Sequence, residues 1–431
     1  MRDLLIMAII LGGSAVALRK PWIGIILWTW VSLMNPHQQW GYASASMPIA
    51  MIVGVSTLTG FLFTREKQNP FFSPATWMLA AFVLWISITL PFSLYFENSL
   101  PLWNRSIKIY LMLFITLALL DSVKKMDIYI WTLVASIGFY GVKGGAFTLA
   151  TGGNHRVWGP GGFIGGNNEI ALAVIMVIPL MRYLQLQMTK KWHRHMMSVS
   201  MILSAVMALG THSRGALLAL AAMTLLIWLR GRQKIIFGAM VIGIALLALP
   251  FMPEHWWSRM ATIQTYEEDR SAMGRINAWW MAWNLAKDRI IGGGFEIYNQ
   301  TVFGMYAPDP YAVHAAHSIY FQILGEHGFI GLALFLTLGM ITWQTSRQLM
   351  AIGKENPTLS WTRDLGAMAQ ASMVGYAVGG AFLSLAYFDL PYNIMIIVML
   401  AKYFATQQLS KYKSPNIGEH RTIREHAKSL T

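Results

Sequence analysis

Four side chains able to bind anions or transfer protons lie within or beside the one long polar loop of an otherwise hydrophobic chain. They are Arg214, Arg275, His314 and His317. Arginine binds anions through paired hydrogen bonds, and histidine takes up or releases protons near neutral pH. These residue types together favour a site that holds an anion and moves a proton.

Arg214 follows the corner Thr211-His212-Ser213, which joins two hydrophobic stretches and leaves no room for a longer loop. We therefore expect Arg214 at the start of a helix, where backbone N–H groups and the helix dipole favour an anion. Ser213 or Thr211 is expected to cap that helix. The alternative is an arginine that only anchors the helix end at the membrane interface.

Arg275 lies in the first turn of a helix predicted over residues 274–287. Trp279, Trp283 and Ala286 recur there at helical spacing, so this helix can lie on the membrane surface. A cation in a first turn is disfavoured unless an anion accompanies it. That anion is either a ligand or the carboxylates of residues 267–269. After the helix, the three glycines 292–294 permit a sharp turn or a close approach to a ligand.

His314 and His317 are three residues apart, so they share a face if the segment is helical. They are interpreted as two metal ligands, as one general base, or as packing at the interface. A metal needs a third ligand, and the neighbouring sequence offers only Asp309, without a His-Glu-x-x-His pattern. The single base is therefore favoured. Glu326 and His327 lie two to three turns further on, which is too deep to share the site.

The glycine-rich stretch 152–169 has none of the spacings of a phosphate-binding loop. Arg156 or Asn168 can still line a site from this stretch. A flexible turn is the favoured interpretation.

Composition defines the elements that must position these residues. The chain has 431 residues, 55% of them hydrophobic and 12% charged, whereas soluble domains carry about 25% charged residues. It is therefore expected to be an all-α polytopic membrane protein. The net charge of +14 is dispersed in short clusters, which does not favour nucleic acid as a partner, and the absence of cysteine excludes disulfides and thiolate chemistry.

The hydrophobic stretches predict 12 or 13 spans, and the basic loops alternate to one side, which is therefore cytoplasmic. The opposite side holds residues 36–46, 96–105, 151–167, 211–215 and 253–317. Ala15-Val16-Ala17 resembles a signal-peptidase site, but we expect the segment to be retained. The predicted spans cover residues 4–18, 21–35, 47–63, 74–95, 106–120, 128–150, 168–188, 196–211, 214–229, 235–252, 318–345, 366–386 and 391–409. The predicted regions are spans in 1–252, a loop in 253–317, further spans in 318–410 and a cytoplasmic tail in 411–431.

Several motifs follow one another in a specific order. Ser213-Arg214-Gly215 opens a span, Arg275 precedes tryptophan in an Arg-x-x-x-Trp pattern, and Gly294-Phe295 follows. His317-Ser318-Ile319-Tyr320 and a glycine pattern over 325–331 complete the set. In type, order and spacing over roughly residues 150–345, these motifs resemble the O-antigen ligase and polymerase superfamily, and in particular O-antigen ligases.

The resemblance implies a glycosyltransferase of the integral-membrane C type that needs no metal or other cofactor. The implied donor is a glycan on undecaprenyl pyrophosphate, and the implied acceptor is the lipid A–core of lipopolysaccharide. The enzyme would lie in the bacterial inner membrane with its site facing the periplasm. Carried over by motif, Arg214 and Arg275 hold the donor pyrophosphate and His317 is catalytic. His314, Arg156 and Gly294 are expected to line the substrate site.

Three alternatives remain open. An O-antigen polymerase uses the same donor and lengthens another lipid-linked chain, and a protein O-glycosylation ligase uses hydroxyl groups of exported proteins. A transporter of an anionic substrate would carry the arginines along an anion path. It predicts related halves and charges near the membrane midplane, whereas the key charges here cluster at one face.

Overall fold

The computed structural model describes residues 2–41, 44–230, 254, 257 and 270–413, and these residues form helices joined by short connections. The expectation of an all-α membrane protein is confirmed. The predicted span 235–252 and the acidic residues 267–269 lie outside the described residues. Before that gap the α-helices are α1 (Arg2–Ala17), α2 (Pro21–Met34), α3 (Pro36–Trp40), α4 (Ile49–Phe63), α5 (Pro74–Ile88), α6 (Phe96–Leu119), α7 (Val123–Ala150), α8 (Asn167–Gln187), α9 (Lys191–Gly210) and α10 (Arg214–Arg230).

The second described part carries the remaining helices. They are α13 (Arg270–Asp288), α14 (Gln300–Tyr306), α15 (Ile319–Glu355), α16 (Ser360–Gly380) and α17 (Asp389–Lys413). Short 3-10 turns are η1 (Ser44–Ser46), η2 (Leu90–Phe92), η3 (Gly162–Ile164) and η5 (Pro357–Leu359). Among the described helices, five are long and apolar enough to cross a membrane: α5 with η2, α6, α7, α8 and α15. Helices α2 and α4 are apolar but shorter, so the total of 12 or 13 spans stays a prediction.

Two predicted boundaries were wrong. The loop expected at 96–105 is helical, because α6 begins at Phe96 and continues through Pro101. The loop predicted at 253–317 keeps its bounds as a prediction; its described part contains α13, where a helix was expected, and the short helix α14. Helix α16 occupies residues 360–380 instead of 366–386, and a non-helical connection from Ala381 to Phe388 follows it. Hydropathy alone missed these boundaries because polar residues start α6 and α16, while the connection after α16 is itself apolar.

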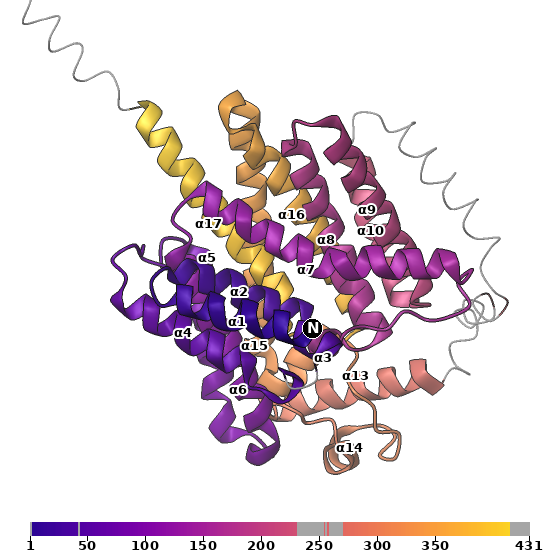
Figure 1. The fold of residues 1–431 in the computed structure, drawn as a ribbon. Helices are drawn as coiled ribbons and strands as arrows, with labels where there is room; N and C mark the ends of the chain where they lie inside the picture. The colour runs from indigo at the N-terminus through magenta and orange to yellow at the C-terminus, as the bar shows by residue number, and fades with distance from the viewer. Residues whose placement is uncertain (1, 42–43, 231–253, 255–256, 258–269, 414–431) are drawn as a thin grey trace, which may run out of the picture.

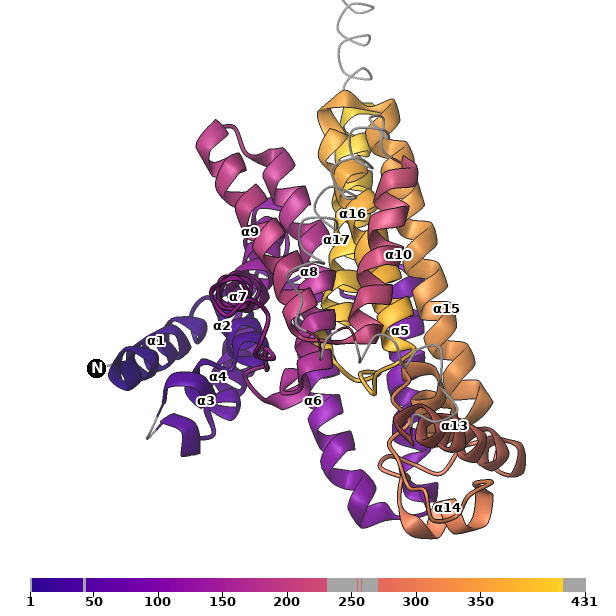
Figure 2. The same ribbon diagram turned by 90° about the vertical axis from the view of Figure 1, so that its right-hand side faces the viewer.

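The helices fall into an upright bundle and a set that runs across it. Helices α15, α16 and α17 stand side by side in Figure 2, whereas α7 is seen end-on there and runs across the molecule in Figure 1. At the lower end of both views, α13 and α14 lie beside the start of α15. The part of the long polar loop from residue 270 to residue 317 is therefore gathered at one end, and α17 leaves the bundle at the other.

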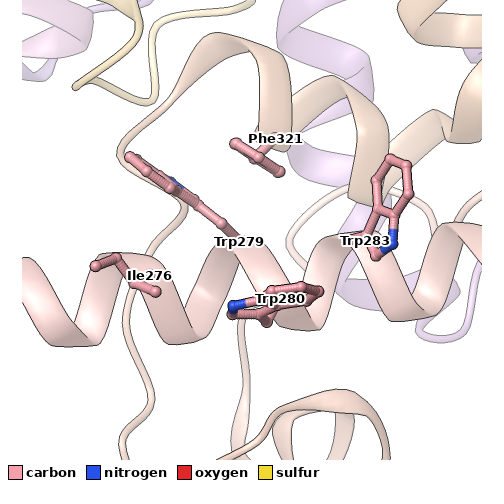
Figure 3. A pocket seen from close by; sticks show the side chains of 5 residues that line it. All are labelled: Ile276, Trp279, Trp280, Trp283 and Phe321. Carbon is pink, nitrogen blue, oxygen red and sulfur yellow. The ribbon is translucent and has the colours of Figure 1, made fainter.

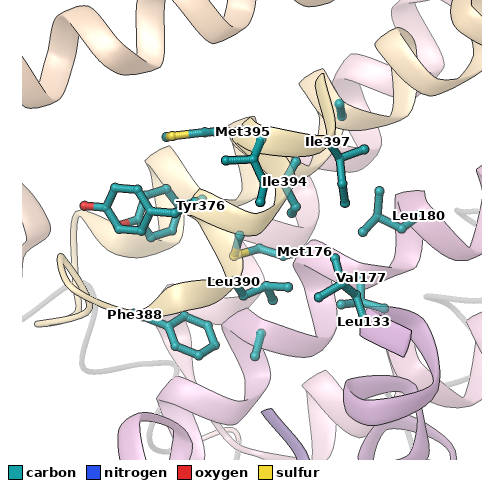
Figure 4. Packing of buried hydrophobic residues seen from close by; sticks show 14 of the residues in the cluster. Leu133, Met176, Val177, Leu180, Tyr376, Phe388, Leu390, Ile394, Met395 and Ile397 are labelled. Atoms are coloured by element: carbon teal, nitrogen blue, oxygen red, sulfur yellow. The ribbon is translucent and has the colours of Figure 1, made fainter. Parts of the chain in front are cut away.

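The core lies where α8 and α17 cross α7 and α16. Met176, Val177 and Leu180 of α8 face Ile394 and Ile397 of α17 (Figure 4), and all five side chains are fully buried. Helix α8 is apolar on all sides because its neighbours surround it, which is the expected pattern for a central helix. This packing gives the site a rigid frame.

Candidate functional site

The corner between α9 and α10 places Arg214 as predicted. Helix α9 ends at Gly210, and α10 begins at Arg214. Between them His212 adopts a left-handed backbone with φ of 56°. The Ser213 hydroxyl accepts a hydrogen bond of 3.2 Å from the Ala216 amide, so Ser213 is the N-cap. Arg214 is half-buried in the first turn of α10, at the end of the helix where an anion is favoured.

The glycine-rich stretch before α8 is docked on this corner. The His212 ring pairs with the Gly153 carbonyl at 2.9 Å, and the Val157 amide donates to the Gly210 carbonyl at 3.2 Å. From the other end, Asn167 donates to the Thr211 carbonyl at 2.8 Å. A flexible turn was the favoured interpretation; in the structure, the carbonyls of Gly210 and Thr211 and the ring of His212 bind this stretch. Arg156 lies between Gly153 and Val157, which are both hydrogen-bonded to the corner. Its contact with a substrate stays a prediction.

Helix α13 confirms the helix predicted over 274–287 and extends it by about one turn at its start. Arg275 therefore lies in the second turn of α13 and not in the first. Asn277, two residues on, donates to the carbonyls of Asp309 and Ala312 at 2.8 and 3.1 Å. The Oδ1 atom of the same Asn277 side chain accepts from the Asp309 amide at 2.9 Å. Asn277 thus holds the segment that leads to His314 against α13.

His314 packs on α13 at a position where only glycine fits. A Cβ atom on Gly274 would lie 2.7 Å from three atoms of the His314 ring. The imidazole therefore rests directly on the backbone of the turn that carries Arg275. Gly274 explains how a bulky ring and a helix come this close.

The segment that carries the two histidines is not helical, so the condition for a shared helix face is not met. Residues 312–317 have no regular structure, and α15 begins at Ile319. His317 has a left-handed backbone with φ of 42°, which non-glycine residues seldom adopt. Its amide donates to the Ser384 hydroxyl at 2.9 Å. Trp279 of α13 donates to the preceding carbonyl, that of Ala316, at 2.7 Å.

The electrostatic surroundings keep the His317 imidazole neutral. Burial, the Arg275 guanidinium and His314 together lower the pKa of His317 to about 4, and burial has the largest effect. Burial disfavours the charged imidazolium, and a neighbouring cation disfavours it further. The imidazole of His317 is therefore neutral, and able to accept a proton, at neutral pH. Arg275 also interacts electrostatically with Glu169 in the first turn of α8.

One connection links the two halves of the site. A Cβ atom on Gly215, next to Arg214, would lie 3.3 Å from the Phe382 Cβ. Ser384, which binds the amide of His317, is two residues beyond Phe382. The connection between α16 and α17 is therefore in contact with α10 beside Arg214 and with the backbone of His317.

The glycine turn after α13 is packed tightly against α15. Gly294 has φ of 87°, and its amide donates to the Glu326 carbonyl at 2.9 Å. A Cβ atom there would lie 2.2 Å from the Ser93 Cβ. Gly294 is buried, so its observed role is close packing, and a contact with the donor stays a prediction. Glu326 and His327 are also buried, at 1% and 0% exposure.

An aromatic hollow lies on α13 next to the site. Ile276, Trp279, Trp280, Trp283 and Phe321 line a space of about 400 Å³. Figure 3 shows Trp279 and Phe321 facing each other where the start of α15 passes over α13. Their rings are stacked, with centroids 5.1 Å apart and an interplanar angle of 7°. The hollow begins one residue after Arg275 and is lined entirely by apolar side chains.

Comparison with known protein families agrees with the motifs. Residues 199–336 match the family described as O-Antigen ligase. Over these residues the chain belongs to the O-antigen ligase/polymerase superfamily. Residues 1–189 match a second family, described as a family of unknown function, DUF5935. A search of curated proteins gives no match for the chain.

Membership of the O-antigen ligase/polymerase superfamily indicates an enzyme related to glycosyl transfer. The matched segment contains Arg214, Arg275, His314 and His317, whereas Arg156 lies before it. Within the part of the chain that the structure describes, no three His, Cys, Asp or Glu side chains gather as a metal site would require. Asp309, the only third ligand suggested by the sequence, accepts a hydrogen bond from the Tyr311 amide at 3.0 Å.

The sequence analysis missed two residues that contact the segment around His317, Trp279 and Ser384. Trp279 was noted only for a membrane-facing role, yet its indole binds the Ala316 carbonyl. Ser384 lies in an apolar stretch, 67 positions from His317, without any neighbouring motif. A local pattern contains no signal for such a pair.

Proposed function

We propose that this protein is a metal-independent, inverting glycosyltransferase that acts as an O-antigen ligase in lipopolysaccharide biosynthesis. The donor is a glycan on undecaprenyl pyrophosphate, and the acceptor is a sugar hydroxyl of lipid A–core at the periplasmic face of the inner membrane. The observation that carries the proposal is the half-buried His317 imidazole, kept neutral within electrostatic reach of Arg275.

The reaction requires one proton acceptor and a site for a charged leaving group. The acceptor hydroxyl attacks the anomeric carbon of the donor, the bond from that carbon to the pyrophosphate oxygen breaks, and the proton passes to His317. Attack from the face opposite the leaving group inverts the anomeric centre. As the pyrophosphate departs it gains negative charge, which Arg214 and Arg275 offset.

The electrostatics are consistent with this order of events. In the protein alone, Arg275 disfavours a proton on His317. A bound pyrophosphate balances the guanidinium charge, so the proton affinity of the imidazole rises when the donor is present. His317 is then a stronger base in the complex than in the protein alone.

The hollow on α13 suits the apolar part of the donor. Its lining of Ile276, three tryptophans and Phe321 presents hydrocarbon surface to a polyprenyl chain. It begins beside Arg275, so the pyrophosphate and the first isoprene units of one molecule lie along neighbouring turns of α13.

The proposal is tested with purified protein in detergent and EDTA, an undecaprenyl-pyrophosphate-linked glycan and lipid A–core. Joined glycan–lipid A–core that depends on His317 supports the ligase. Longer lipid-linked glycans without modified lipid A–core identify a polymerase instead. Glycan on exported protein acceptors identifies a protein O-glycosylation ligase. If none of these products forms and an anionic substrate crosses vesicles containing the protein, transport replaces transfer.

A further inference from the structure

The connection from Ala381 to Phe388 is held in place by several side-chain hydrogen bonds. The Tyr376 hydroxyl donates to the Leu385 carbonyl at 3.0 Å, and the Tyr392 hydroxyl donates to the Ala386 carbonyl at 2.7 Å. Tyr376 belongs to α16 and Tyr392 to α17, and both are almost fully buried. The connection is therefore fixed by the two helices that it joins.

The start of α15 binds the same connection from the other side. The Ala386 amide donates to the Gln322 side chain at 3.2 Å, and the Tyr387 hydroxyl donates to the Glu326 carboxylate. Glu326 also accepts from the Glu296 amide at 3.3 Å, which adds the segment after α13. Gln322 and Glu326 are one turn apart, so they face the connection together.

Ser384 is the member of this connection that contacts the base. Its hydroxyl accepts the hydrogen bond from the His317 amide at 2.9 Å. His317 has φ of 42°, and a non-glycine residue retains such a backbone only when its surroundings hold it there. The direction of the imidazole follows from this backbone, because φ sets where the Cα–Cβ bond points.

We propose that Ser384 is a positioning residue for His317: its hydroxyl, on a connection fixed by Gln322 and Glu326, holds His317 in the left-handed conformation that aims the imidazole at the acceptor. The inference rests on the proposed role of His317 as the base. Without the hydroxyl, the His317 backbone relaxes toward negative φ and the ring is displaced. A displacement of about 1 Å is enough to cost on the order of 10²-fold in rate.

The test compares Ser384→Ala, Ser384→Thr and His317→Ala in the transfer assay, with kcat and the KM for the donor measured on folded protein. Ser73→Ala is the matched control, because the Ser73 hydroxyl also accepts from a backbone amide, that of Thr76 at 3.3 Å, at the start of α5. We expect Ser384→Ala to lower kcat by 10- to 100-fold with little change in KM. Ser384→Thr restores kcat because it keeps the hydroxyl, and Ser73→Ala leaves kcat unchanged.

Each outcome separates the two proposals. If Ser384→Ala transfers at the wild-type rate while His317→Ala does not transfer, the positioning role is wrong and the base remains. A wild-type rate for His317→Ala overturns the proposed mechanism itself. An equal loss of kcat for Ser384→Ala and Ser384→Thr also overturns the positioning role. If Ser384→Ala does not accumulate, Ser384→Cys, with its weak sulfur acceptor, takes its place and the same loss of kcat is expected.

Discussion

Trp279 of α13 donates its indole N–H to the carbonyl of Ala316, the residue before His317, over 2.7 Å. The indole ring is stacked on Phe321 in the first turn of α15. One side chain therefore joins the helix that carries Arg275 to the backbone of the proposed base. The relative placement of the cation and the imidazole depends on this bond.

Replacing Trp279 by phenylalanine removes the donor and retains an aromatic ring on Phe321. Ala316 is fully buried, so its carbonyl is left without this partner, and we expect a loss of about 1–3 kcal/mol in stability. The rate of transfer falls as well, because the backbone before His317 is less fixed. Thermal unfolding in detergent and transfer assays check both effects. Trp192→Phe, at an exposed position of α9, is the control, and equal unfolding temperatures for the two variants would argue against the bond.

Arg275 is expected to need its guanidinium and not only its charge. Arg275→Ala should lower kcat/KM by about 10²–10³-fold, the usual effect of removing one charge-stabilising donor. Arg275→Lys keeps the charge and loses the paired hydrogen bonds, so its kcat/KM should lie between those of the wild type and Arg275→Ala. Lys287→Ala removes an exposed cation from the last turn of the same helix and should leave the rate unchanged. If Lys287→Ala lowers the rate as much as Arg275→Ala, the rate depends on the net positive charge of α13 and not on a specific role of Arg275.

The sequence predicted those parts of the site that depend on local pattern. Helical spacing located α13, and the short corner located Arg214 at the start of α10, because caps and periodicity are properties of neighbouring residues. Residue type, position in the long polar loop and the resemblance of the motifs selected Arg275 and His317 as candidates. These features need no knowledge of distant segments.

The arrangement of the histidines was not predictable in this way. Spacing of three residues puts His314 and His317 on one face only if the segment is helical, whereas the left-handed backbone at His317 is bound by Ser384, which is remote in sequence. The glycine-rich stretch likewise looked flexible from its residue types, whereas its partners in the corner at 210–212 are the carbonyls of Gly210 and Thr211 and the ring of His212. Tertiary hydrogen bonds of backbone groups have no signature in residue type.

The transfer rate should depend on pH through His317. Its pKa is about 4 in the folded protein, so the imidazole is neutral and able to accept a proton throughout the neutral range. We expect kcat/KM, which reports the protein without substrate, to be level from about pH 6 to 8 and to fall as the pH drops through about 4 to 5. His195→Ala, at an exposed position of α9, should show the same profile. A fall centred near pH 6.5, the ordinary value for histidine, would contradict the buried, cation-flanked environment.

The same shift in pKa affects stability. The folded-state pKa of His317, about 4, is below the ordinary value of 6.5, so between these values the unfolded chain binds the proton more strongly. The contribution of His317 to stability is therefore present above about pH 6.5 and is lost as the pH falls toward 4. His317→Gln should unfold with a weaker dependence on pH in this window, measured as unfolding temperature in detergent. An identical dependence in wild type and variant would show that His317 is not protonated on unfolding.

Gly328 is expected to be essential for the packing of the glycine turn on α15, whereas Gly339 in the same helix is not. Gly328 has φ of 68°, and a Cβ atom there would lie 1.7 Å from the Ile290 carbonyl oxygen. At Gly339 a Cβ atom meets no described atom within 4 Å. Gly328→Ala should therefore lower the unfolding temperature strongly and reduce the yield of folded protein. Gly339→Ala should raise stability by up to about 1 kcal/mol, because alanine is the better helix former. Equal unfolding temperatures for the two variants would mean that the kink at Gly328 is not needed to accommodate the turn after α13.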